Sequence, residues 1–179
     1  MSDFSSFYIA ASGAAATLLG LLFIAIQFNI DAFSDDATDR WRAIARSTFA
    51  IYVVLFILPL TFLVPGLPAS SHGLTLMIGA SIGIYRAVRT WWPVWRKAIQ
   101  RKSERWWQLA RLLLGPLVVY GWFVYSGFEL LTGQSVLGAQ LSFALALIFL
   151  FIIALVNSWN LLVELTYERK LSVGKKPAK

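Results

Sequence analysis

Five stretches of this chain are long and apolar enough to cross a lipid bilayer as helices. A spanning helix needs roughly 20 mostly apolar residues, because each residue adds about 1.5 Å to its length. The connections between the stretches are short and carry charged or turn-forming residues. We therefore predict an all-α fold in which residues 1–179 form a single domain, a bundle of five transmembrane helices. The expected spans are residues 6–30, 41–64, 73–92, 109–131 and 137–166.

The composition also indicates a membrane protein. Of the 179 residues, 58% are hydrophobic and 14% are charged, and the mean hydropathy is +0.67, whereas about 25% of residues are charged in an average soluble domain. The first apolar run is too long for a signal peptide and lacks a basic beginning, which predicts a permanent span. Because the net charge of +7 comes from basic residues placed between spans, we expect anionic lipid as the partner and no nucleic acid.

The distribution of Lys and Arg predicts the orientation of the bundle. Positively charged connections stay on the cytoplasmic side of a membrane. With the N-terminus outside, all sixteen Lys and Arg residues lie on or near the cytoplasmic face, including those of the tail, residues 167–179. A four-span topology without residues 73–92 would place the two main basic clusters on opposite sides of the membrane. We therefore predict five spans, with the C-terminus in the cytoplasm.

The cytoplasmic connection at residues 93–108 combines basic and aromatic side chains. Trp residues favour the depth of the lipid headgroups, and each nearby basic residue adds about 1 kcal/mol of attraction to anionic lipid. We predict a headgroup anchor in the cytoplasmic leaflet, with a docking site for a soluble partner as the alternative. Pro93 is expected to end or bend the third helix. The predicted headgroup residues are Trp91, Trp92, Trp95, Arg96, Lys97, Arg101, Lys102, Arg105, Trp106 and Trp107.

Small residues at helical spacing occur in the first and third stretches. Such residues let two membrane helices approach closely. We interpret them as helix-packing faces, and a face that lines a wet path is the alternative in the first stretch. The predicted packing residues are Gly13, Ala16, Gly20, Gly79 and Gly83.

The last stretch carries a polar column in the segment "NSWNLLVEL". Asn157, Asn160 and Glu164 are three and four residues apart, a spacing that places them on one face of a helix. An unpaired polar group in hydrocarbon costs several kcal/mol, so each is expected to meet a partner on another helix. The column either bonds helices together or lines a path for an ion or proton. The partners expected from their depth are Gln27, Arg46 and Arg86.

Four polar residues lie toward the ends of the predicted spans. Arg86 lies about two turns from the cytoplasmic boundary, where it can snorkel to the headgroups, and Thr90 shares its face. Glu129 is expected near the outer surface, either solvated or marking the entrance of a cation path. We expect His72 in an exposed outer loop.

Two segments near the ends of the chain have a family pattern: "SGAAATLLGLLFIAIQFN" at residues 12–29 and "NSWNLLVEL" at residues 157–165. They resemble the first and last spans of a family of small, uncharacterised bacterial integral membrane proteins. "FLVPG" at residues 62–66 and "VYGWFVYSGFELLTG" at residues 119–133 fit the same layout. The resemblance implies the bacterial inner membrane and the same architecture, and it implies no particular activity.

Among function classes, an enzyme is the least expected. The chain has no cysteine, one histidine and nine acidic residues, and we find no nucleophile with a base, paired catalytic acids or metal-binding pattern among them. We therefore expect no catalytic residues, no metal and no cofactor. The leading hypothesis is a homo-oligomeric ion channel with a weakly polar pathway on its symmetry axis. The alternative is a non-conducting accessory or scaffold subunit that packs against another membrane protein and binds anionic lipid.

Overall fold

The computed structural model describes residues 4–28, 39–100, 106–133 and 135–174. The described part of the chain is all-helical, without strands, as predicted. Four of the helices are long and apolar enough to cross a membrane, and α3 does not meet that criterion. The helices are α1 (Ser5–Phe28), α2 (Asp39–Thr61), α3 (Ala69–Gln100), α4 (Trp106–Thr132) and α5 (Val136–Gly174).

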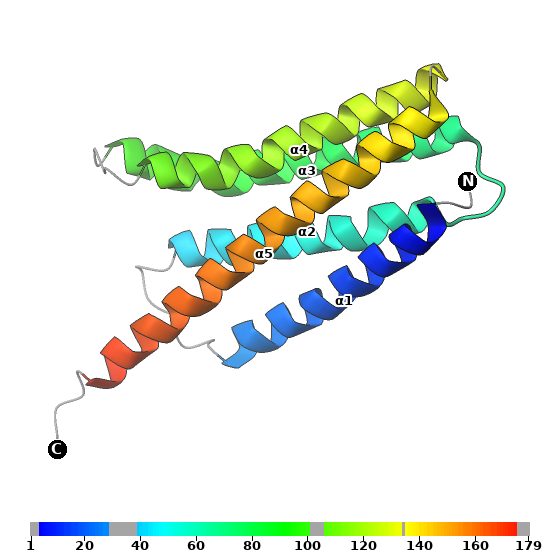
Figure 1. Ribbon diagram of the computed structural model, residues 1–179. Helices are drawn as coiled ribbons and strands as arrows, with labels where there is room; N and C mark the ends of the chain where they lie inside the picture. Colours follow the sequence, from blue (N-terminus) through cyan, green and yellow to red (C-terminus); the bar gives the residue numbers. More distant parts are fainter. Residues whose placement is uncertain (1–3, 29–38, 101–105, 134, 175–179) are drawn as a thin grey trace.

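The five helices form an elongated bundle in which consecutive helices run in alternating directions (Figure 1). α3 and α4 lie side by side and make the most extensive contact, while α1 packs mainly on α2. α5 crosses the bundle obliquely and contacts both α4 and α2 (Figure 1). α1 begins at one end of the bundle and α5 ends at the other (Figure 1).

Two glycines hold α3 and α4 at backbone contact. A Cβ atom added to Gly73 would lie 2.6 Å from the carbonyl oxygen of Gly127, and one added to Gly127 would lie 2.8 Å from that of Gly73. Real Cβ atoms do not approach other atoms this closely, so neither position accepts a side chain without separating the helices. The sequence motif that predicted packing in α3 did not include either glycine.

α3 is longer at both ends than the predicted span, residues 73–92. It begins at Ala69, where the carbonyl oxygen of Pro68 accepts hydrogen bonds from the backbone amides of Ser71 and His72. At its other end it continues through Pro93 to Gln100, so Pro93 does not end the helix. The stretch that was expected to begin the cytoplasmic connection is therefore helical as far as Gln100.

His72 is buried, and the expectation of an exposed loop was wrong. The earlier start of α3 turns its ring into the bundle, where only 2% of the residue is exposed. Phe62 stacks on His72 at 4.6 Å and on Phe143 at 4.7 Å, so three rings form a column between α2, α3 and α5.

Candidate functional site

A groove of about 790 Å³ lies between α2 and α3, within the size range of ligand sites. Ile26 of α1 and Pro116 and Tyr120 of α4 complete its lining. The groove is open to the outside, since Ile57 and Ile82 on its walls are 49% and 54% exposed. We call it the basic groove, because its charged lining residues are Arg42, Arg46 and Arg86.

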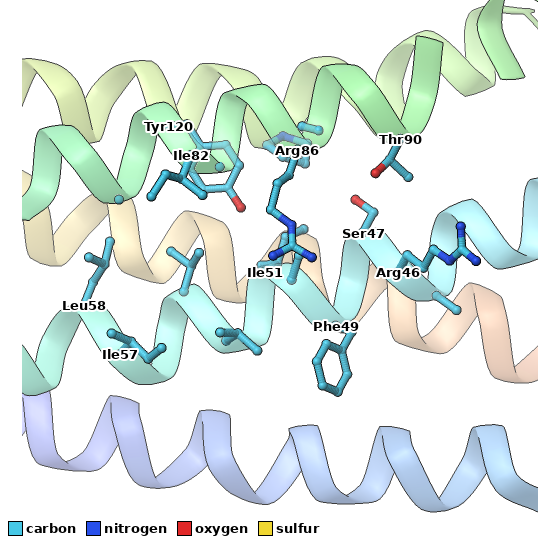
Figure 2. Close-up of a pocket in the computed structure, with 18 of the residues that line it drawn as sticks. Arg46, Ser47, Phe49, Ile51, Ile57, Leu58, Ile82, Arg86, Thr90 and Tyr120 are labelled. Atoms are coloured by element: carbon cyan, nitrogen blue, oxygen red, sulfur yellow. The ribbon is translucent and has the colours of Figure 1, made fainter. Parts of the chain in front are cut away.

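The antiparallel packing of α2 and α3 sets which side chains face each other across the groove. Gly79 of α3 lies against Leu58 of α2, because a Cβ atom on the glycine would come within 2.9 Å of that leucine. Further along, Arg86 reaches over Ile51, and Thr90 lies opposite Ser47 (Figure 2). In these facing pairs the residue numbers on α3 rise as those on α2 fall, which is the register of two antiparallel helices.

The two ends of the basic groove differ in chemistry. Its arginine end contains Ser47 and Thr90 with Arg46 beside them, and the side chain of Arg86 extends from α3 toward α2 on the side of the apolar end (Figure 2). Its apolar end is lined by hydrocarbon and glycine, and the lining there contains no charged residue within the described part of the chain. The residues that line the apolar end are Val54, Ile57, Leu58, Gly79, Ile82 and Gly83.

The described lining of the basic groove supplies no negative charge to neutralise its arginines. No Asp or Glu is present among the described residues that line it. Arg46 and Arg86 make no hydrogen bond or ion pair with another described residue, although the charge of Arg86 acts on the nearby Tyr120. A guanidinium group carries five N–H donors and favours carboxylate or phosphate oxygens as acceptors. The basic groove can therefore hold an anionic group at one end and an apolar chain at the other.

Two residues of the predicted polar cluster meet in this groove, whereas Gln27, Asn157 and Asn160 do not line it. Arg46 and Arg86 both line it. Asn157 is buried at 4% exposure, whereas Asn160 and Gln27 are exposed on the outside of α5 and α1. The side chain of Glu164 lies outside the described part of the chain, so the expectation that it meets Arg46 or Arg86 stays a prediction.

The two amides of the predicted polar column lie on different sides of α5, with Asn157 buried and Asn160 exposed. α5 packs through Ala154, Asn157 and Leu161, which follow one another at spacings of three and four residues. Asn160 precedes Leu161 by one residue, a rotation of about 100°, so it points away from the bundle. The expectation that both amides face neighbouring helices was wrong for Asn160 within this chain.

The small residues predicted as packing faces behave differently in the two helices. Gly79 packs against Leu58 of α2, and a Cβ atom on Gly83 would lie 2.8 Å from the Tyr120 ring of α4. Gly13, Ala16 and Gly20 of α1 are instead exposed, with nothing within 4 Å of a Cβ built on either glycine. They form no packing face inside this chain. α1 packs through Tyr8, Ser12, Ala15 and Leu22 instead.

The headgroup anchor is described only in part. Trp92 and Arg96 are exposed, as an anchor requires. Trp91 is only 2% exposed, since it continues the buried face of Ala80 and Ala87, so its predicted headgroup contact is wrong. Arg101, Lys102 and Arg105, together with the side chains of Trp95, Lys97, Trp106 and Trp107, lie outside the described residues.

Glu129 lies near the end of α4 and accepts a hydrogen bond of 2.8 Å from the hydroxyl of Tyr125. This contact joins residues one turn apart on the same helix and brings no second acidic group to Glu129. Among the described residues, no group of three or more His, Cys, Asp or Glu side chains could hold a metal ion. The role of Glu129 as an entrance stays a prediction.

Thr90 was placed with Arg86 by helical spacing, but Ser47 was missed. Its position next to Arg46 gives no signal by itself, because only the packing of α2 on α3 brings it opposite Thr90. No family model, curated protein or solved structure matches this chain. The interpretation of the site therefore depends on its geometry and chemistry.

Proposed function

We propose that the protein is a non-conducting accessory protein of the bacterial inner membrane that binds an anionic phospholipid in the basic groove. The observation that carries this proposal is Arg86, a cation in a largely apolar cavity without an acceptor among the described residues. Arg86 is exposed to the groove and lies about two turns from the predicted cytoplasmic boundary. A charged side chain inside a membrane requires a partner, and an anionic ligand would supply one.

The shape of the basic groove favours a lipid over a small soluble anion. Its arginine end offers cationic and hydroxyl donors, and its apolar end continues between Ile57 and Ile82. Both isoleucines are about half exposed, so a chain lying between them would also contact the surrounding lipid. Burial of each CH₂ group of that chain contributes about 0.8 kcal/mol. A headgroup and an acyl chain would therefore both be bound.

The proposed topology has five crossings, with the N-terminus outside and the C-terminus in the cytoplasm. α3 has 32 residues, so it is about 48 Å long and exceeds the ~30 Å thickness of the hydrocarbon core. Two of the residues that lower its hydropathy, Arg86 and Thr90, face the basic groove. The arginine end then lies in the cytoplasmic half of the membrane, where anionic lipid is available.

Wild-type protein in neutral detergent is expected to bind phosphatidylglycerol about tenfold or more tightly than phosphatidylcholine of the same chain length. Each arginine near the headgroup contributes about 1 kcal/mol toward an anionic lipid, and 1.4 kcal/mol corresponds to a tenfold difference. Native mass spectrometry of protein offered both lipids at equal concentration measures this preference. Equal occupancy by the two lipids would contradict the proposed function.

A homo-oligomeric ion channel is the second candidate. The exposed amides of Gln27 and Asn160 favour it, because a polar group on the outside of a membrane helix needs a partner in another subunit. Purified protein in liposomes would then carry an ion flux that changes on Asn160→Leu substitution. The proposed lipid-binding function predicts no flux from either protein.

A further inference from the structure

Two hydroxyl groups face each other at the arginine end of the basic groove. Ser47 projects from α2 and Thr90 from α3, with their oxygens turned toward one another (Figure 2). Neither hydroxyl makes a hydrogen bond with another described residue, and both residues line the groove. Both hydroxyls are open to the groove, so a ligand in the groove can form hydrogen bonds with them.

Other threonines in the bundle form a hydrogen bond within their own helix. Their hydroxyls donate to the backbone carbonyl one turn earlier, the usual solution for threonine in a helix. Thr90 could reach such a carbonyl as well, since α3 is helical around it. Its hydroxyl is instead directed at the groove. Examples are Thr17, Thr48 and Thr75, which donate to the carbonyl oxygens of Gly13, Ile44 and Ser71 over 3.0, 2.8 and 2.9 Å.

The arginines bracket the two hydroxyls along the groove. Arg86 is four residues before Thr90, about 6 Å along the helix axis, and it approaches from the apolar side. Arg46 precedes Ser47 directly and lies on the other side of the hydroxyl pair, with its guanidinium group directed away from the pair in this structure (Figure 2). Donors from two helices thus line one volume at the arginine end, and a change of the Arg46 rotamer would bring its guanidinium group to it.

We infer that this volume is the subsite for the phosphate group of the bound phospholipid. The inference rests on the proposed function and specifies its ligand: Arg86, Ser47, Thr90 and Arg46 bind the phosphate, and an acyl chain follows the apolar end. Two guanidinium groups and two hydroxyls offer twelve N–H and O–H donors, counting five per arginine. A carboxylate has two oxygens in one plane, whereas the phosphate oxygens point in several directions. Phosphate can therefore accept from both helices at once.

A lipid phosphate fits the basic groove better than free phosphate does. Free phosphate would leave the apolar end facing water or unfilled, because the hydrocarbon lining between Val54 and Ile82 offers it no hydrogen-bond donor. A chain attached to the phosphate would cover this lining. We therefore assign the subsite to a lipid headgroup, and inorganic phosphate becomes a control in the test.

Chain-matched ligands test the inference directly. Binding of dodecyl phosphate, dodecanoate and the neutral monododecanoyl glycerol to the purified full-length protein is measured by isothermal calorimetry in detergent. We expect dodecyl phosphate to bind about tenfold or more tightly than dodecanoate, and the neutral ligand to bind most weakly. Inorganic phosphate at the same concentration should not displace dodecyl phosphate. Equal affinity for phosphate and carboxylate, or displacement by inorganic phosphate, would overturn the phosphate subsite.

Variants that lack the hydroxyl of Ser47 or Thr90 provide a second test of the phosphate subsite. Ser47→Ala and Thr90→Val are each expected to weaken dodecyl phosphate binding about five- to tenfold and dodecanoate binding less than threefold. Thr17→Val is the matched control, because Thr17 lies on α1, does not line the groove and donates to its own helix. Unchanged phosphate affinity in both groove variants, or equal losses for the two anions, would overturn this inference alone. Failure of every amphiphile to bind the wild-type protein would overturn the proposed function as well.

Discussion

Replacement of Arg86 by glutamate is expected to lower the affinity for anionic phospholipid at least about 100-fold. A hydrogen bond to a charged group contributes about 1.5–3 kcal/mol, and every 1.4 kcal/mol corresponds to a tenfold change in affinity. The substitution removes the guanidinium that crosses the basic groove and places a negative charge near the phosphate. Titration of the variant with phosphatidylglycerol, followed by native mass spectrometry, measures the loss.

Arg89→Glu is the matched control for this experiment. Arg89 lies on the same helix, and its replacement makes the same change in net charge. Both arginines are exposed, but Arg89 does not line the basic groove and donates a hydrogen bond to the Tyr85 hydroxyl instead. We expect its phospholipid affinity to stay within about threefold of the wild-type value. Arg86→Gln, which removes the positive charge without adding a negative one, covers the case in which Arg86→Glu fails to fold. Equal losses for the variants at positions 86 and 89 would show that only the overall charge matters.

Gly127→Leu is expected to lower the free energy of unfolding by about 3 kcal/mol or more. The Cβ atom alone would lie 2.8 Å from the carbonyl oxygen of Gly73 and 2.9 Å from Met77, and the leucine adds three further carbons. Overpacking of a well-packed core costs about 1–3 kcal/mol. This contact is more severe, because a backbone atom cannot turn aside as a side chain can. Unfolding by sodium dodecyl sulfate in mixed micelles, followed by tryptophan fluorescence, measures the change.

Gly121→Leu on the same helix is its control. A Cβ atom at Gly121 has nothing within 4 Å, and the residue is exposed. The same glycine-to-leucine change should therefore alter the free energy of unfolding by less than about 1 kcal/mol. Similar destabilisation of both variants would mean that helix propensity, and not the contact of α3 with α4, sets the loss.

The helices themselves could be predicted from the sequence, because apolar runs of membrane length have few alternatives to a helix. The predicted α1, α2 and α4 agree with the structure within three residues at each end. α3 and α5 continue beyond the predicted limits, to Gln100 and Gly174. Hydropathy marks the part of a helix that lies in lipid, whereas backbone hydrogen bonds extend the helix into polar sequence.

Which face of each helix turns inward could not be predicted in the same way. In a soluble protein the polar side of a helix faces water. Here the exposed side of a helix also carries large apolar residues, such as Ile9, Phe23 and Trp159. The difference in polarity between the exposed and the buried face of a helix, which locates the core of a soluble protein, is therefore small. Gln27 and Asn160 were placed inside on the rule that polar groups avoid lipid, and both are outside within this chain.

The basic groove was predictable only on the α3 side. Helical spacing placed Gly79, Gly83, Arg86 and Thr90 on one face, and three-dimensional packing kept them together along the groove. The α2 side depends on the register of two antiparallel helices, which the contact between Gly79 and Leu58 sets. A shift of one turn would replace Ser47 opposite Thr90 with another residue. No pattern in the sequence of either helix specifies that register.

Electron cryomicroscopy of the wild-type protein in nanodiscs that contain phosphatidylglycerol tests the central claim most directly. We predict density for one lipid in the basic groove, with its phosphate between Arg86 and the hydroxyls of Ser47 and Thr90 and a chain between Ile57 and Ile82. A groove that holds no lipid, or one that is covered by a helix of a second copy, would contradict the account.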